Sequence, residues 1–441
     1  MRMDFKAALL AVGMMVSGSA IAGAQEATEY YEDAGNVSYT STIADDAAAC
    51  GDVAACGGAC DTGCNSCGSG CGLLSWPCCG HGDAWTLFPE NCCGIKIGGH
   101  LSAGYYGNAR GRNTQTGNGP LGFNNNAQNV VLNQVWLYAE KEADAETYCF
   151  DLGYRVDGMF GADGPDTQAF SHGNRDVWDN RWDSGSFMGG AIPQAYLTAA
   201  WGNWNVKAGH FYTTIGYEVV PATGNFFYSH AYTMVYAEPF THTGVLAEYN
   251  GLENMTVYGG WTNGWDAAFD TYEGGSTFLG GVSMDLTDRT SMTWMVNIGD
   301  WGSQNDGNIF MNSLVFDVDL GCGLNYIFQT DLGNNTNITG EQTYWYGANQ
   351  YLLKEINDCW SVGVRAEWFC DEDGARIAAT GPGNYYAATF GVNWKPNANI
   401  TVRPEVRFDK FDDIGAGGGT PFADGNHDDI MFYGLDAIFT F

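Results

Sequence analysis

One short segment decides the fold class: residues 400–409 read ITVRPEVRFD. Every second residue from Ile400 to Phe408 is apolar, whereas the alternate positions include Arg403, Glu405 and Arg407. A β-strand turns successive side chains to opposite faces, so this strand has one apolar face and one charged face. A strand that separates lipid from a water-filled lumen needs this pattern.

The same alternation recurs through the C-terminal part of the chain. Segments at 150–157, 313–320, 360–369 and 431–441 all place apolar or aromatic residues at every second position. The sixteen predicted strands are 95–106, 129–140, 147–158, 192–201, 204–211, 243–250, 254–262, 277–286, 290–299, 309–320, 322–331, 343–353, 358–369, 384–395, 399–411 and 429–441. Short and long links alternate between them, as tight periplasmic turns and long outer loops do. We therefore predict an all-β fold: a transmembrane, antiparallel, up-and-down β-barrel of about sixteen strands over 95–441, with an N-terminal Cys-rich extension.

Composition agrees with a membrane barrel. Only 16% of the 441 residues are charged, 14% are aromatic, and the formal net charge is −33. A barrel that shows aromatic residues to lipid and acidic residues to water has this balance. Lys and Arg together number 18, and a nucleic-acid partner requires clustered cations. We therefore expect no nucleic acid as a partner.

The N-terminus has the features of an export signal. Arg2 and Lys6 precede an apolar run at 7–16 that is too short to span a bilayer. The small residues at 22–24 fit a cleavage site, so we predict a signal peptide over 1–24; cleavage after Ala22 and a buried amphipathic helix are the alternatives. A polar linker over 25–49 and a Cys/Gly-rich segment over 50–94 follow.

The Cys/Gly-rich segment contains ten of the fourteen cysteines: Cys50, Cys56, Cys60, Cys64, Cys67, Cys71, Cys78, Cys79, Cys92 and Cys93. An even number of cysteines in an exported chain indicates disulfides. The spacing of Cys64 and Cys67 is also found in zinc sites, so a metal stays an alternative, as does a lipid-linked or cell-wall-linked arrangement. A Gly-rich segment that buries no core needs such cross-links to hold a shape.

Two C-terminal features resemble known proteins. The terminal residues 437–441, AIFTF, together with the export signal and the alternation of links, resemble bacterial porins. Residues 238–244, EPFTHTG, precede a Val/Leu strand and resemble the OmpL-like β-barrel porin family. The resemblance implies the outer membrane of a diderm bacterium, contact with outer-membrane lipid, and a homo-oligomer, namely a trimer. It also implies that Phe441 is the signal read by the barrel-assembly machinery.

The resemblance further implies a pore. Sixteen strands leave an aqueous channel, and in porins the third long loop folds into the lumen, which here is 212–242. The constriction candidates are Glu218, Glu238, Tyr228 and Tyr232 of this loop, with Arg365, Arg403 and Arg407 of the wall. In one interpretation, the acidic loop and the basic wall face each other across a narrow hole. In the other, Arg403 and Arg407 pair with Glu405 and Asp409 on the same face and neutralise the wall. Net acidity and lumen positions at Asp151, Asp317 and Asp319 favour cations.

These observations predict a porin for passive diffusion of small hydrophilic solutes or ions, with a preference for cations. The alternative is a non-conducting barrel that acts as a receptor, adhesin or envelope scaffold through the Cys-rich segment. The chain has only seven His, five of them dispersed within strands or loops, and it lacks hydrolase and metalloprotease motifs. We therefore predict that it is no enzyme and holds no cofactor. Acidic clusters at 371–374 and 424–429 leave open loop-bound divalent cations, although no full calcium-loop spacing is present.

Overall fold

The computed structural model describes residues 84–89, 94–110, 117–170, 178–185, 187–269, 274–302, 307–337, 340–377, 381–415 and 419–441. They belong to the larger of two compact units, Asp33–Phe441. The predicted signal peptide, the polar linker and all ten cysteines of the Cys-rich segment lie outside the described residues.

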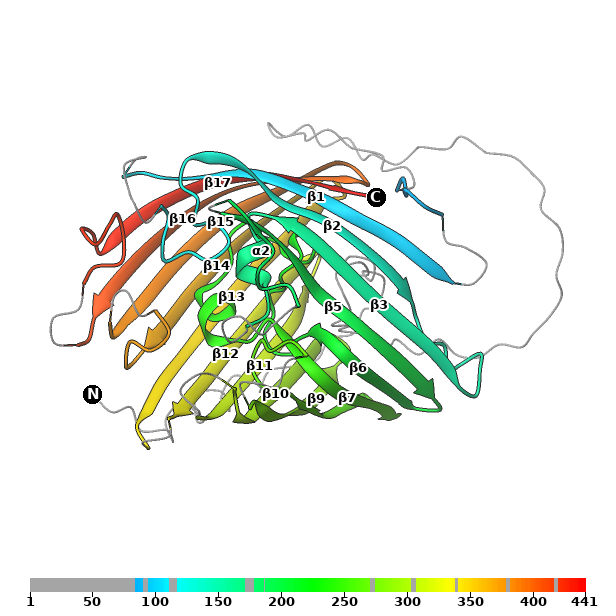
Figure 1. The fold of residues 1–441 in the computed structure, drawn as a ribbon. Coiled ribbons are helices and arrows are strands. Elements are labelled where there is room, and N and C mark those ends of the chain that lie inside the picture. The colour runs from blue at the N-terminus through cyan, green and yellow to red at the C-terminus, as the bar shows by residue number, and fades with distance from the viewer. Residues whose placement is uncertain are drawn as a thin grey trace, which may run out of the picture. The chain divides into compact units, whose positions relative to one another are not determined.

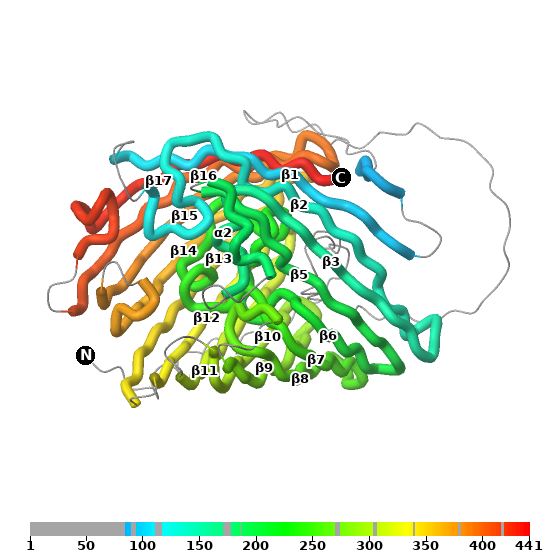
Figure 2. Tube along the Cα trace, viewed as in Figure 1, coloured from blue at the N-terminus to red at the C-terminus, as the bar shows by residue number. Residues whose placement is uncertain are grey.

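Sixteen long strands form one closed antiparallel sheet (Figure 1). They are β1 (Ile95–Asn108), β2 (Asn129–Lys141), β3 (Asp151–Gly161), β5 (Met188–Trp201), β6 (Trp204–Tyr212), β7 (Thr241–Leu252), β8 (Met255–Thr262), β9 (Ser276–Thr287), β10 (Thr290–Asp300), β11 (Asn308–Gly321), β12 (Leu324–Thr336), β13 (Gln342–Asn357), β14 (Trp360–Asp371), β15 (Gly383–Asn397), β16 (Ile400–Asp413) and β17 (Asp429–Thr440). A two-residue strand, β4 (Asp183–Ser184), pairs with β5 in the preceding loop. Successive long strands are neighbours in the sheet, which Figure 2 traces from β1 to β17.

All sixteen predicted strands are present, and the prediction of a barrel is confirmed. The strands differ from the prediction mainly in length. For example, β12 continues to Thr336 because Asn308 and Gln342 of its neighbours still pair with it. In contrast, β3 begins at Asp151 and not at 147. The preceding turn is held locally, because Asp144 accepts hydrogen bonds from the backbone N–H groups of Glu146 and Thr147 at 3.0 and 2.8 Å.

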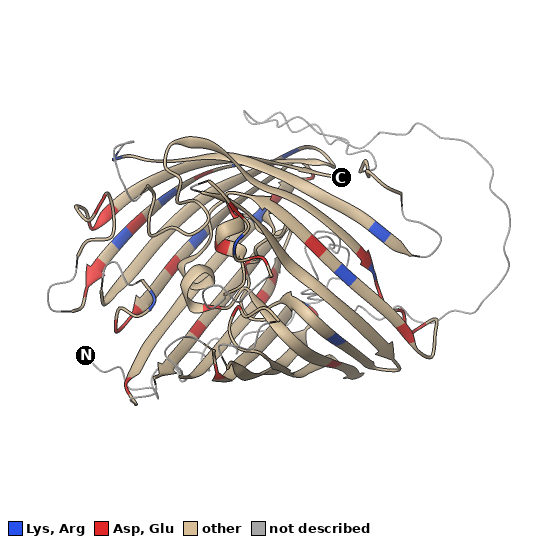
Figure 3. Ribbon diagram, viewed as in Figure 1, with Lys and Arg blue, Asp and Glu red and all other residues tan. Residues whose placement is uncertain are grey.

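The two faces of the sheet differ as the alternation predicts. Phe408 on the apolar face of β16 is 56% exposed, whereas its neighbour Arg407 is buried within the barrel. Acidic and basic residues both occur along the strands of the barrel, as Figure 3 shows. The helical turns are short: α2 (Gly164–Thr167), η1 (Ala222–Gly224) and η2 (Thr233–Ala237). Within the described part of the chain, no helix has the length and apolar character needed to cross a membrane.

The barrel closes between its first and last strands. β1 pairs with β17 so that Leu101 lies opposite Phe439. At the end of this seam, Gly99 and Phe441 exchange two backbone hydrogen bonds of 2.9 Å. A Cβ atom on Gly99 would lie 2.1 Å from the carbonyl oxygen of Trp136 and 3.1 Å from the ring of Phe441. The close approach of three strands at this point therefore requires glycine.

Replacing Gly99 by alanine should lower the fraction of folded, heat-modifiable barrel in the outer membrane. The added methyl group would clash with the Trp136 carbonyl of β2 and press against the Phe441 ring beside the seam, and overpacking of this kind costs about 1–3 kcal/mol. Gly259→Ala is the matched control, because a Cβ atom there meets nothing within 4 Å. The measurement is gel mobility with and without heating. Equal folded fractions for the two variants would contradict the close packing of Gly99 against Trp136 and Phe441.

Candidate functional site

The link between β6 and β7 is the candidate site. It comprises residues 213–240, includes η1 and η2, and is called the inner loop below. Its backbone groups form hydrogen bonds with strands that come much later in the chain. The Tyr217 N–H donates to Gln329 of β12 at 3.1 Å, and the Trp345 indole of β13 donates to the carbonyl of Ala237 at 3.2 Å. These contacts place the loop against the inner wall. The range agrees with the predicted loop 212–242 to within two residues at each end.

Arg365 of β14 binds the inner loop directly. Its Nη1 lies 2.7 Å from Oε1 of Glu218 and donates to the carbonyl of Ser229 at 2.6 Å. Its Nε donates to Glu367 on the same strand at 2.7 Å. The Arg365 side chain is 0% exposed. A fully buried guanidinium is tolerated because each edge has a charged or carbonyl partner.

Arg403 and Arg407 of β16 bind the loop through its carbonyl groups. Nη1 of Arg403 donates to the carbonyls of Ala222 and Asn225 at 2.9 and 2.6 Å. Nη1 of Arg407 donates to the carbonyl of His230 at 2.7 Å. The three wall arginines together therefore take up carbonyl groups of the loop that would otherwise be buried without a donor.

Wall carboxylates take up the loop's N–H groups. Glu405 of β16 accepts from the backbone of Tyr228 at 2.8 Å and from that of Ser229 at 3.2 Å. Glu367 of β14 accepts from the backbone of Tyr232 at 2.9 Å, and the Tyr232 hydroxyl donates to Asp409 at 2.5 Å. The mixed charges of the wall thus match the donors and acceptors of an irregular backbone.

The structure places the predicted charges in contact, not across a gap. Glu218 and Arg365 form a buried ion pair. Arg407 pairs with Asp409 at 2.8 Å, as the alternative interpretation of the wall has it. Arg403 pairs with Asp436 of β17 at 2.6 Å, whereas Glu405 is used by the loop amides. That partner was missed because Arg403 and Asp436 are opposite one another only in the register of β16 with β17.

The two loop carboxylates differ in their charge. Burial acts to raise the pKa of Glu218, but the Arg365 guanidinium and the hydrogen bonds from His230 and Ala231 outweigh it and hold the pKa at about 2. Glu238 is also buried, and burial together with the nearby Asp331 carboxylate raises its pKa well above the usual value. It hydrogen-bonds to Gln329. Glu218 is therefore an anion at neutral pH, whereas Glu238 favours the protonated form.

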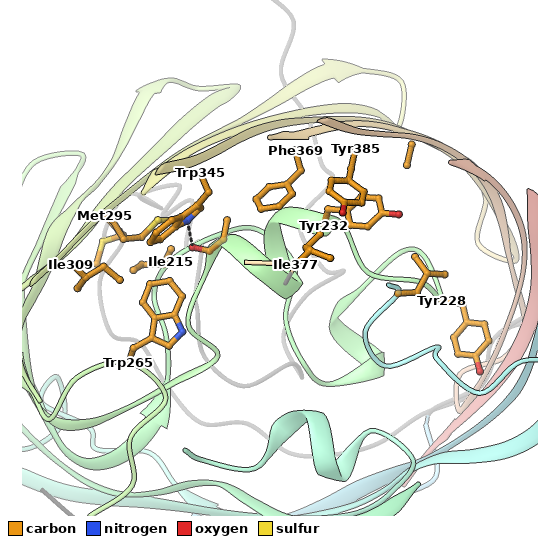
Figure 4. Packing of buried hydrophobic residues seen from close by; sticks show 14 of the residues in the cluster. Ile215, Tyr228, Tyr232, Trp265, Met295, Ile309, Trp345, Phe369, Ile377 and Tyr385 are labelled. Atoms are coloured by element: carbon orange, nitrogen blue, oxygen red, sulfur yellow. Dashed lines mark hydrogen bonds between the residues drawn. The ribbon is translucent and has the colours of Figure 1, made fainter. Parts of the chain in front are cut away.

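The predicted tyrosines pack inside the barrel. Figure 4 shows Tyr232 beside Phe369 and Tyr385 in the main apolar cluster. The ring centroids of Tyr232 and Tyr385 are 5.1 Å apart, and the Arg407 guanidinium lies 4.8 Å from the Tyr232 ring. The Tyr228 hydroxyl donates to Asn133 of β2 at 2.9 Å. Both tyrosines are buried and serve to fix the loop.

An arginine that the sequence did not single out secures the loop from another side. Arg376, between β14 and β15, lies 5.0, 5.7 and 4.8 Å from the ring centroids of Trp265, Trp301 and Trp345. Its Nε donates to the carbonyl of Tyr236 in the inner loop at 2.5 Å. Three tryptophans around one cation give a stable cation–π arrangement. The four residues come from four separate segments and form no motif with a recognisable spacing. The cluster therefore could not be predicted from the sequence.

Loop-bound cations stay a prediction. In the cluster at 371–374, the Asp371 carboxylate accepts backbone hydrogen bonds from Ala375, Arg376 and Ile377 at 2.9, 2.9 and 2.7 Å. Both oxygens of the Asp371 carboxylate thus accept backbone hydrogen bonds. Over the residues that the structure describes, no group of three or more His, Cys, Asp or Glu side chains is arranged to hold a metal ion.

Comparison with known proteins identifies the family. Residues 94–441 match the model of a family described as "Putative beta-barrel porin-2, OmpL-like". The chain belongs to this family. No curated protein matches the sequence. The match covers the whole barrel and excludes the Cys-rich segment apart from its last residue, Gly94, so the OmpL-like porin resemblance seen in the sequence is confirmed.

Solved outer-membrane proteins share the barrel fold. An anion-selective porin from Comamonas acidovorans has a TM-score of 0.55 at 10% identity, over 79% of this chain and 99% of that chain. The outer-membrane channel DcaP of Acinetobacter baumannii has a TM-score of 0.54 at 14% identity, over 81% and 100%. OmpT of Vibrio cholerae, in its trimer form, has a TM-score of 0.51 at 10% identity, over 79% and 99%. At these identities the likeness concerns the fold.

Replacing Arg365 by methionine should loosen the inner loop. Glu218 would be left buried without its arginine, and Glu367 would keep only Arg407, at 3.4 Å. Breaking a buried pair costs about 3–5 kcal/mol. Hydrogen exchange of peptides that cover 228–232 should become faster by about tenfold or more. Lys410→Met is the control, because Lys410 pairs with Asp428 at an exposed position. Unchanged exchange in Arg365→Met would show that the guanidinium does not hold the loop.

Proposed function

We propose that this OmpL-like porin forms a water-filled channel for the passive diffusion of small hydrophilic solutes or ions across the outer membrane. The observation that supports the proposal is the inner loop, which is hydrogen-bonded to the inner wall of a sixteen-strand barrel. A barrel of this size leaves an aqueous lumen, and a loop attached inside it narrows the passage. The inner loop is therefore the constriction.

In this proposal, the charged candidates act by holding the loop and not by facing the solute. Arg365, Arg403 and Arg407 bind loop carbonyls, and Glu218 is paired with Arg365. Because each of the three arginines is paired with a carboxylate, an acidic loop that faces a basic wall across the hole is not expected. The bulk of the loop, which includes the packed rings of Tyr228 and Tyr232, sets the size of the hole.

A preference for cations comes from acids elsewhere in the lumen. Asp317 and Asp319 alternate with apolar residues on β11, and none of the ion pairs between described residues involves either one. Asp151, by contrast, pairs with Lys141 at 2.8 Å and contributes less. Carboxylates in an aqueous passage raise the local concentration of cations, an effect that salt screens. The formal net charge of −33 acts in the same direction.

We further propose how the protein is assembled in the membrane and that it has no catalytic role. The protein sits in outer-membrane lipid as a homo-oligomer, a trimer like the trimer form of the Vibrio protein. Phe441 serves as the signal for the barrel-assembly machinery. The ionisable groups of the inner loop and wall are engaged in binding backbone and each other, so we assign the protein to transport and not to catalysis.

Deleting residues 222–236 should raise single-channel conductance in a planar bilayer. The deletion removes the part of the inner loop that binds Arg403, Arg407 and Glu405, and with it the bulk that narrows the hole. Heat-modifiable mobility shows whether the variant folds. A folded variant with the conductance of the wild type would place the narrowest point of the channel elsewhere.

The reversal potential under a salt gradient should show a preference for cations at low salt. Replacing Asp317 and Asp319 together by asparagine should weaken it, because the change removes two negative charges that have no cationic partner among the described residues. The control is Asp412→Asn with Asp413→Asn, at the exposed end of β16. An anion preference in the wild type, or an equal loss in both double variants, would refute the assigned role of β11.

A further inference from the structure

The two ends of the inner loop meet at one side chain of the barrel wall, Gln329 of β12. Its Oε1 accepts a hydrogen bond from the Tyr217 N–H, near the start of the loop, at 3.1 Å. Its Nε2 donates to the carboxyl group of Glu238, near the end of the loop. The ends of the loop also touch each other, because the Glu238 carboxyl group occupies the space in which a Cβ atom on Gly216 would lie. Glu238 and Gln329 thus fasten both ends of the loop to β12.

Glu238 is held against a second acid and not against a cation. The Gln329 Nε2 that binds Glu238 also donates to Oδ2 of Asp331, on the same strand, at 2.7 Å. Both acids are buried, with exposed fractions of 3% and 1%. None of the ion pairs between described residues involves either acid. The other glutamate of the loop, Glu218, is instead paired with Arg365.

The charged groups around Glu238 do not supply the missing cation. Glu218 is itself an acid, and its negative charge acts on Glu238. Arg376 is directed at a loop carbonyl and at tryptophan rings. Asp266, from the link between β8 and β9, accepts backbone N–H groups at the end of the loop at 2.6 and 2.8 Å. The strand next to β12, β13, contributes the uncharged Trp345 indole, which donates to a loop carbonyl at 3.2 Å.

Two buried carboxyl groups on one amide nitrogen cannot both be ionised without a large cost in free energy. With one proton between them, one group donates a hydrogen bond to the other, and the pair carries a single negative charge. Oδ1 of Asp331 is a buried oxygen with no hydrogen-bond partner among the described residues, so a second full charge would be poorly solvated. Burial and the neighbouring Asp331 carboxylate raise the pKa of Glu238 well above its usual value, which agrees with a proton retained at neutral pH.

We propose that Glu238 and Asp331 form a proton-binding site, in which one shared proton fastens both ends of the inner loop to β12. When the proton is released to water, the two carboxylates repel each other and Glu238 leaves Gln329. This inference deepens the proposed function, because it rests on the inner loop as the constriction and adds its control by pH.

The direction of the pH dependence follows from the raised pKa of Glu238. A carboxyl group whose pKa is raised in the attached loop binds its proton more tightly there than in a released loop. The attachment is therefore strongest below the usual glutamate pKa of ~4.3 and is lost as the pH rises through the raised value. Alkaline pH should loosen the loop and widen the passage.

Infrared spectroscopy of the folded full chain in detergent tests the proton site without any need for conduction. A protonated carboxyl group has a C=O stretching band that a carboxylate lacks. We expect this band at neutral pH to lose intensity in Glu238→Gln and in Asp331→Asn, because each variant leaves one acid that an amide can solvate in its ionised form. Glu248→Gln is the matched control, from β7, where Glu248 is bound by Asn250 of its own strand, and it should keep the band. Loss in Glu238→Gln alone would show that burial holds the proton without sharing, and loss in neither variant would show that no proton is held; both results would overturn the proposal.

Single-channel recording over a rising pH tests the effect on the loop. Heat-modifiable mobility first shows that each variant folds. The conductance of the wild type and of Glu248→Gln should rise as the carboxyl pair loses its proton. Glu238→Gln keeps a neutral side chain that still hydrogen-bonds, so it should lose this rise. An equal rise in Glu238→Gln would contradict control of the loop by the pair. In a folded chain that does not conduct, the proposed function fails, whereas the infrared bands still decide the proton site.

Discussion

The pairing of wall charges with the backbone of the inner loop is the interaction on which the site depends. An irregular loop inside a barrel has no neighbouring strand to satisfy its N–H and C=O groups, and each one buried without a partner costs free energy. Here arginines of β14 and β16 take the carbonyls, and glutamates of the same two strands take the amides. The charges in turn satisfy one another, as Arg403 does with Asp436 and Arg407 with Asp409. The network can thus be buried because most of its groups have partners; Nη2 of Arg407 is a buried nitrogen that finds no hydrogen-bond partner among the described residues.

Much of the fold could be predicted because the barrel imposes a period of two on the sequence. The alternation in ITVRPEVRFD marks both the strand and its two faces, and the outward position of Phe408 and the inward position of Arg407 follow from it. Strand ends were harder, because pairing with a neighbour extends a strand beyond its apolar pattern. β12 reaches Thr336 for this reason.

The partners of the site could not be predicted, because they lie far apart in the sequence. Glu218 and Arg365 are separated by 147 positions, and Tyr228 and Glu405 by 177. Arg376 is surrounded by three tryptophans from three other segments. Alternation shows that a residue faces inward, but whether it meets water or a folded loop depends on where that loop goes. Residues that looked like the charged lining of a pore instead bind the inner loop.

In the proposed channel, the inner loop sets the width of the passage, and acids outside the loop set its charge. Each wall arginine that binds the inner loop is paired with a carboxylate, so under the proposed function the sign of the selected ion would depend on lumen acids outside the loop. The Comamonas porin, which is anion-selective by its description, has a similar barrel at 10% identity.

The most direct test is single-channel recording of the purified protein with neutral polymers of increasing size. The account predicts steady conductance and a polymer cut-off well below the diameter of a sixteen-strand lumen. A protein that folds but does not conduct, or that admits polymers as wide as the empty barrel, would contradict it.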